Sequence, residues 1–197
     1  MKHSNAKEIL IDRAITLLGT VGIDKATTKA IVADTGISEV YIYRNFANKE
    51  DLLAKAFEAL DEELVQKVML HIHVMYIQSM EYRDRCRFFF TAVWDFLLQN
   101  QIKFAAFSRY YYSPYFVKYS SDSHKERFAP LVAIFQEAFK SETDVWMLLN
   151  HILTTMLIFA MRVYDGQFPN DEDTANYVFS VVYHSIYPHF KHAGETK

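Results

Sequence analysis

The 197-residue sequence contains little cysteine, glycine or proline. Its one cysteine, Cys86, has no partner for an internal disulfide, which predicts a chain suited to the reducing cytosol. No glycine occurs between residues 37 and 165, and over that stretch Pro114 and Pro130 are the two prolines. No segment alternates apolar and polar residues as a half-buried strand does. Few helix breakers, with apolar residues three to four apart, predict long helices and an all-α fold.

Signals for export, membrane insertion and catalysis are also absent. Residues 1–15 contain no long apolar run, so no secretory signal is predicted and we expect a cytoplasmic protein. The most apolar segment, residues 145–164, is interrupted by polar residues such as Asn150, Thr155 and Arg162, which predicts a buried helix and no membrane partner. Phosphate-binding glycine loops, nucleophile elbows and zinc-ligand spacings are missing, so we predict no enzyme, no catalytic residue, no cofactor and no metal site. His184, His189 and His192 near the C-terminus suggest adventitious metal binding at most.

Basic residues are slightly fewer than acidic ones, 21 against 24, and they are unevenly distributed along the chain. The formal net charge of −3 argues against a general coat for nucleic acid. Residues 1–50 contain seven Lys or Arg and six Asp or Glu, whereas the remaining residues contain fourteen and eighteen. Only a local patch in the N-terminal part is therefore expected to face phosphate.

The apolar periodicity predicts nine helices. They cover approximately residues 5–20, 28–34, 39–45, 49–76 and 81–99, a short aromatic helix ends near 113–114, and three more begin near 123, 141 and 170. Pairs with capping-box spacing suggest the starts of four of them: Asn48 and Asp51, Ser123 and Glu126, Ser141 and Asp144, Asn170 and Asp173. The helix from residue 5 buries Leu10, Ala14, Leu17, Leu18 and Val21.

The segment over residues 27–46 has the pattern of two short helices around a tight turn. Gly36 occupies the turn, where its tolerance of positive φ is useful, and Ser38 is a favourable N-cap for the second helix. Ile42 and Phe46, four residues apart, are expected to bury one face of that helix. The opposite face then suits a DNA major groove. A simple helical hairpin with a solvated face is the alternative that spacing alone leaves open.

Residues 9–53 resemble the N-terminal domain of the TetR family of transcription regulators. The resemblance keeps its spacing without a gap, and it is carried by Ile9, Ala14, Leu17-Leu18, Gly22, Thr27-Thr28, Ile31-Val32-Ala33, Gly36-Ile37-Ser38, Tyr43, Phe46 and Asn48–Leu52. It implies a DNA-binding domain over residues 1–48, a linking helix over 49–76, and a ligand-binding and dimerisation domain over 77–197.

The resemblance also implies a set of DNA contacts. These are Thr28, Lys29, Ser38, Glu39, Val40, Tyr41, Tyr43, Arg44, Asn45 and Lys49. Glu39, Val40 and Tyr41 would face base edges, whereas Tyr43 and Lys49 would bind phosphates. The family often has glycine at the position of Val40 and a small hydroxyl residue at that of Tyr41. These departures predict an operator particular to this chain, or a Tyr41 that packs inside the domain.

Residues 81–120 are dense in aromatic side chains, most of which are expected in the core. The resemblance implies a small-molecule effector among the middle helices of the C-terminal domain. Candidate lining residues are Phe90, Trp94, Phe107, Tyr111, Trp146 and Asn150, and candidate polar anchors are Arg87, Arg109 and His151. Surface ion pairing is the competing explanation for the arginines.

The family further implies a homodimer formed by the last two long helices, over residues 145–164 and from about 170 to 186. A two-fold dimer would read a palindromic operator in double-stranded DNA. We therefore predict a ligand-responsive regulator, a repressor released from its operator by a small apolar or aromatic effector. The alternatives are a ligand-independent DNA-binding protein or an activator of the same fold.

Overall fold

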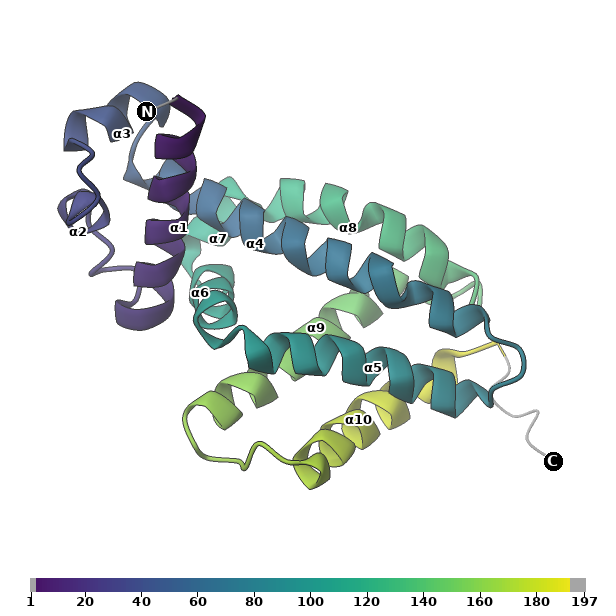
Figure 1. The fold of residues 1–197 in the computed structure, drawn as a ribbon. Coiled ribbons are helices and arrows are strands. Elements are labelled where there is room, and N and C mark those ends of the chain that lie inside the picture. Colours follow the sequence, from purple (N-terminus) through teal and green to yellow (C-terminus); the bar gives the residue numbers. More distant parts are fainter. Residues whose placement is uncertain (1–2, 192–197) are drawn as a thin grey trace. The chain divides into compact units, whose positions relative to one another are not determined.

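The computed structural model describes residues 3–191, and this part of the chain is helical throughout (Figure 1). The predicted all-α fold is confirmed. The helices, in chain order, are α1 (His3–Val21), α2 (Thr28–Val32), α3 (Glu39–Asn45), α4 (Lys49–His71), η1 (Ile72–Tyr76), α5 (Tyr82–Gln99), α6 (Gln101–Tyr111), α7 (Pro114–Tyr119), α8 (Ser121–Gln136), α9 (Val145–Tyr164), α10 (Glu172–Ile186) and η2 (Tyr187–His189).

The chain divides into two compact units. The first comprises residues up to 64 together with 100–127, and the second comprises 65–99 together with 128 onward. Helices α4 and α8 each contribute residues to both units. The functional boundaries predicted after residues 48 and 76 concern which residues bind DNA, ligand and partner, so they stay predictions.

In the first unit, α1 lies against α6 at very short range. A Cβ added to Gly19 would lie 2.1 Å from the backbone oxygen of Ile102, so only glycine permits this approach. The guanidinium of Arg109 donates hydrogen bonds to the carbonyl oxygens of Leu18 and Gly19 at 2.8 and 2.6 Å. The stripe predicted for α1 is buried at Leu10, Ala14 and Leu18, but Val21 is exposed because α1 ends there.

The first unit also buries an ionic cluster. Asp61 is fully buried and accepts a hydrogen bond from His124 Nδ1 at 2.9 Å and another from Arg127. The rings of Phe57 and Phe116 lie beside His124, with centroids 6.0 and 5.4 Å away. Burying a carboxylate is tolerable here because two cationic or polar partners satisfy its oxygens.

In the second unit, α5, α9 and α10 pack against one another (Figure 1). Phe90 and Trp94 of α5 are buried, and the Phe90 ring lies 5.5 Å from that of Phe179 on α10. The Tyr164 hydroxyl donates a hydrogen bond to the Leu97 carbonyl, which ties the end of α9 to α5. Apolar burial on the inner faces thus holds this unit together.

Several predicted helix starts need correction. The capping box at Asn48 and Asp51 is present, since the Asp51 amide donates to Asn48 Oδ1 and the Ala47 amide to Asp51 Oδ2, both at 2.8 Å. For the other three helices the predicted caps were wrong. Helix α8 begins at Ser121, so Ser123 lies inside it; Asp144, not Ser141, caps α9; and Asp171, not Asn170, caps α10.

Helix α7 was missed. Pro114 was interpreted as the end of a helix, whereas it occupies the first turn of α7. Proline is favoured there because its missing amide would have no partner inside the helix. The described residues therefore contain ten α-helices, one more than the nine predicted.

Candidate nucleic-acid interface and effector pocket

The predicted helix-turn-helix is formed by α2 and α3. Thr27 caps α2 by accepting a hydrogen bond from the Ala30 amide at 3.2 Å. Two residues of the turn have left-handed backbone conformations, Gly36 with φ 70° as expected and Asp34 with φ 61°. A Cβ on Gly36 would meet nothing within 4 Å, so the glycine is needed for its conformation and not for space.

Helix α3 has the predicted buried and outer faces. Ile42 and Phe46 are buried against the unit, and Ser38 stands at the N-cap position, although its side chain makes no cap hydrogen bond. On the outer face, Val40 is 58% exposed and Tyr43 is 60% exposed. Two large side chains are thus exposed on one face of this seven-residue helix.

The side chains around this face differ in their freedom. The Thr28 hydroxyl donates a hydrogen bond to the Glu39 carboxylate, which links the start of α2 to the start of α3. The amide of Asn45 donates to the Tyr41 carbonyl at 2.8 Å, and Tyr41 is half-buried. Glu39 and Asn45 are therefore oriented before any DNA is present.

Several cations lie on or next to the helix-turn-helix. Lys29 and Arg44 are exposed, and Lys49 is half-buried at the first position of α4. Lys7, which the sequence interpretation overlooked, places its Nζ 5.3 Å from the centre of the Phe46 ring. No local motif distinguishes Lys7, because its position depends on the packing of α1 against the end of α3.

Comparison with known proteins agrees with this geometry. Residues 10–56 match the model for bacterial regulatory proteins of the TetR family. The N-terminal part of the chain therefore has the TetR-family DNA-binding domain. Its helix-turn-helix is the DNA-binding element of that family of transcription regulators.

Curated and solved relatives differ in how much of the chain they cover. The nucleoid occlusion factor SlmA of Escherichia coli O1:K1 / APEC is 29% identical over 69 residues, which is 35% of each chain, so the match spans about a third of that relative. A TetR-family regulator from Marinobacter aquaeolei VT8 has a TM-score of 0.72 at 14% identity and covers 94% of this chain and 98% of its own. The regulator FadR of Bacillus subtilis, solved with stearoyl-CoA, has a TM-score of 0.63 at 15% identity and covers 89% and 96%. The two structures show that the TetR-family fold extends over both units.

Three predicted effector residues meet in one pocket of the second unit. Arg87, Phe90 and Trp94 line a cavity of about 420 Å³ between α5, the start of α10 and the segment before it. Phe179 lies beside Phe90 and Trp94, and all three rings are nearly buried. Arg87 donates a hydrogen bond to the Asn176 side chain, and its guanidinium lies 5.8 Å from the Phe179 ring. The polar rim also contains Asp95, Asp171 and Glu172.

The other six candidates lie elsewhere. Phe107 and Tyr111 stack on each other in the first unit with ring centres 5.8 Å apart, and Arg109 binds the α1 carbonyls. On α9, the Trp146 ring packs against Phe128, and the Asn150 amide donates to the Trp146 carbonyl. His151 is exposed and hydrogen-bonded to Ser185 on α10 at 2.8 Å. Helical periodicity gave no information on which unit each of these residues joins.

Helices α9 and α10 carry an apolar outer surface. Met147 and Ile158 are exposed on the same face of α9 as His151, and the exposed Tyr177 of α10 lies beside α9 through its contact with Phe159. By length and composition alone, α9 is one helix of the described chain that is long and apolar enough to cross a membrane. Only 28% of its most apolar window is buried, so much apolar surface on this helix has no cover within one chain.

Metal ligands do not gather in the described part of the chain, where no group of three or more His, Cys, Asp or Glu side chains is placed to hold an ion. His192, one of the three C-terminal histidines noted in the sequence, lies outside the described residues.

Proposed function

We propose that this protein is a sequence-specific, ligand-responsive DNA-binding regulator, and that it acts as a repressor. The observation that carries the proposal is the outer face of α3, where Val40 and Tyr43 are exposed within a TetR-family helix-turn-helix. Exposed apolar and aromatic side chains within a DNA-binding motif are available to contact a partner. For this fold the partner is the major groove of double-stranded DNA.

Base recognition is assigned to the start of α3. Val40 presents methyl groups suited to the thymine methyl, and the Glu39 carboxylate accepts from the cytosine amino group. The hydrogen bond from Thr28 fixes the direction of that carboxylate, which favours specificity because fewer side-chain rotamers are lost on binding. Tyr41 and Asn45 complete the base-facing set.

Phosphate binding is assigned to side chains around the rim of α3. These are Lys29, Ser38, Tyr43, Arg44 and Lys49. Such contacts set the register of the protein on DNA and make affinity depend on salt.

We propose that two chains associate through α9 and α10. The exposed Met147, Ile158 and Tyr177 support this, because a four-helix contact between two copies would remove their apolar surface from water. A two-fold dimer fits a palindromic operator. Replacing Ile158 with Glu is expected to give monomers in analytical ultracentrifugation at concentrations where the wild type is dimeric.

The effector is assigned to the 420 Å³ pocket. Its floor of Phe90, Trp94 and Phe179 suits an apolar or aromatic molecule, and Arg87 at the rim offers a hydrogen-bond donor. Binding there would favour a dimer unable to match the operator spacing. Helix α4 is the proposed link, because its residues 49–64 belong to the unit with α3 and its residues 65–71 to the unit with the pocket. A cytoplasmic location follows from this role.

The deciding experiment is selection of bound sequences from random double-stranded DNA, followed by affinity measurement on the enriched site. We expect a palindrome, and we expect Tyr43→Ala to weaken binding about fivefold or more, as loss of a desolvated contact of about 1–3 kcal/mol implies. Tyr112→Ala is the matched control, since Tyr112 is 56% exposed but lies outside α3. No enrichment by the folded protein, or equal losses in both variants, would contradict the proposal.

A ligand-independent DNA-binding protein or an activator of the same fold is the second candidate. The match to SlmA, named as a nucleoid occlusion factor, favours the first of these. Addition of apolar aromatic compounds to the DNA complex separates the cases, because an effector-controlled repressor releases its operator and a ligand-independent protein does not.

A further inference from the structure

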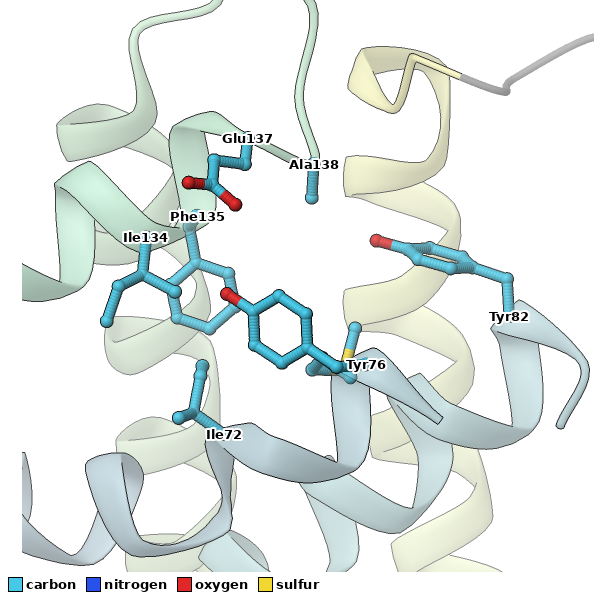
Figure 2. Close-up of a pocket in the computed structure, with 8 residues that line it drawn as sticks. Ile72, Tyr76, Tyr82, Ile134, Phe135, Glu137 and Ala138 are labelled. Carbon is cyan, nitrogen blue, oxygen red and sulfur yellow. The ribbon is translucent and has the colours of Figure 1, made fainter. Parts of the chain in front are cut away.

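A second cavity lies in the second unit, apart from the effector pocket. It has a volume of about 180 Å³ and is formed by η1, the start of α5, and the end of α8 with the residues that follow (Figure 2). Its lining residues are Ile72, Met75, Tyr76, Tyr82, Ile134, Phe135, Glu137 and Ala138. None of them lines the effector pocket.

The size of this cavity suits a molecule with one ring. An apolar protein cavity of about 150 Å³ accepts benzene. The walls here are also largely apolar, formed by Ile72, Ile134, Ala138 and the Phe135 ring, but the pocket is open to solvent beside the exposed Tyr76 and Glu137. Longer chains or fused rings would exceed the volume.

A buried polar atom in the wall has no adequate partner. The Tyr82 hydroxyl is shielded from solvent and makes no hydrogen bond of good geometry. The polar group beside it is the thiol of Cys86, which forms only weak hydrogen bonds. Figure 2 shows this hydroxyl directed into the cavity, and the Glu137 carboxylate directed toward the same space. Buried hydroxyls nearly always have a partner, so a ligand that both donates and accepts a hydrogen bond would complete the site.

Charges around the cavity disfavour charged ligands of either sign. The Glu137 carboxylate repels anions. The Arg85 guanidinium lies 5.3 Å from the centre of the Tyr82 ring, and Lys191 Nζ donates a hydrogen bond to the Glu137 backbone carbonyl at 2.7 Å. These two cations disfavour binding of a cationic ligand. The Arg85 guanidinium donates hydrogen bonds to the carbonyl oxygens of Met75 and Met80, both at 3.0 Å.

We infer that this cavity binds an uncharged, single-ring compound that carries a hydroxyl, that is, a ligand of the phenol class. The ring fills the apolar walls. The ligand hydroxyl accepts from Tyr82, whose buried hydroxyl lacks a good partner, and donates to the solvent-exposed carboxylate of Glu137.

The test measures binding of phenol to the full-length protein by calorimetry, in parallel with toluene, benzylamine and benzoate. We expect saturable 1:1 binding of phenol, about fivefold or more tighter than toluene, because one net hydrogen bond in a buried site has that value. Benzylamine and benzoate are expected to bind more weakly than phenol. Equal binding of phenol and toluene would overturn the assignment of the ligand class.

Two variants locate the site. Ala138→Leu fills the cavity and should abolish phenol binding, whereas Ala133→Leu, on the exposed face of α8, should leave it unchanged. Tyr82→Phe should reduce phenol to the affinity of toluene without lowering the unfolding temperature, since it removes a buried unpartnered hydroxyl. Phenol binding that survives Ala138→Leu or Tyr82→Phe undiminished would overturn the inference. The assay contains no DNA, so its failure is distinct from failure of the proposed function.

Discussion

Replacing Gly19 with Ala tests the closest approach of two helices in the first unit. The new Cβ would lie 2.1 Å from Ile102 O, 2.9 Å from the carbonyl carbon and 2.8 Å from Cγ2 of the same residue. Two of these atoms belong to the backbone, so no side-chain rotation relieves the contact. Helices α1 and α6 would have to separate, and Arg109 would lose its short hydrogen bonds to the Leu18 and Gly19 carbonyls.

The magnitude follows from two opposing terms. Alanine is favoured over glycine inside a helix by about 1 kcal/mol. Overpacking costs about 1–3 kcal/mol, and each hydrogen bond from a charged donor contributes about 1.5–3 kcal/mol. Overpacking and the loss of both Arg109 hydrogen bonds outweigh the propensity gain, so we expect Gly19→Ala to lower the free energy of unfolding by about 3 kcal/mol or more.

Urea unfolding followed by far-ultraviolet circular dichroism measures this difference. Thr20→Ala is the matched control, because Thr20 is the next residue of α1, is exposed, and gains helix propensity without a clash. If Gly19→Ala were as stable as the wild type or more so, the close packing of α1 on α6 would be refuted.

Three further predictions concern the ionic cluster, the DNA interface and the cysteine. Asp61→Ala leaves the buried His124 without its carboxylate and Arg127 with only its longer ion pairs to Glu58 and Glu62, and it is expected to cost about 3–5 kcal/mol in urea unfolding. A loss below about 1 kcal/mol would show that the cluster is hydrated. Lys49→Ala should weaken binding to all DNA sequences alike and reduce the slope of log affinity against log salt by about 0.9, and an unchanged slope would remove Lys49 from the phosphate contacts. Burial raises the pKa of the Cys86 thiol to about 12, so the thiolate is scarce at mildly alkaline pH. Alkylation of Cys86 by iodoacetamide, measured by mass spectrometry, should therefore be slow in the folded protein and fast in denaturant. In the folded protein its rate should increase as the pH rises toward that pKa.

The helix-turn-helix was predictable because its signals are local. Gly36, the N-cap position of Ser38, and the spacing of Ile42 and Phe46 act within one or two turns of helix, and the structure has each of them in the expected role. The left-handed conformation of Asp34 was not predicted, because aspartate adopts it only occasionally and also serves many other local roles. Its φ of 61° is imposed by the connection between α2 and α3.

The pocket residues were predictable only in part. Arg87, Phe90 and Trp94 are three to four residues apart on one helix, so periodicity alone places them on one face. Arg109, like Arg87, is an arginine close to aromatic residues in the sequence, which made it a candidate polar anchor. In the structure it instead binds the backbone of α1, some ninety residues earlier in the chain. The small cavity beside Tyr82 draws on residues from 72 to 138, and no local pattern connects them.

The sequence by itself determined the all-α fold, the helix-turn-helix and the family, because helix propensity, capping and turn chemistry depend on residues within a few positions of each other. Only the tertiary structure decided which aromatic rings are core and which line a cavity, and that Gly19 is a contact residue and not a helix breaker. It also paired Asp61 with His124 and Arg127 across more than sixty residues of chain. These outcomes depend on which helix faces meet, and facing is set by packing of the whole unit, which periodicity along one helix does not encode.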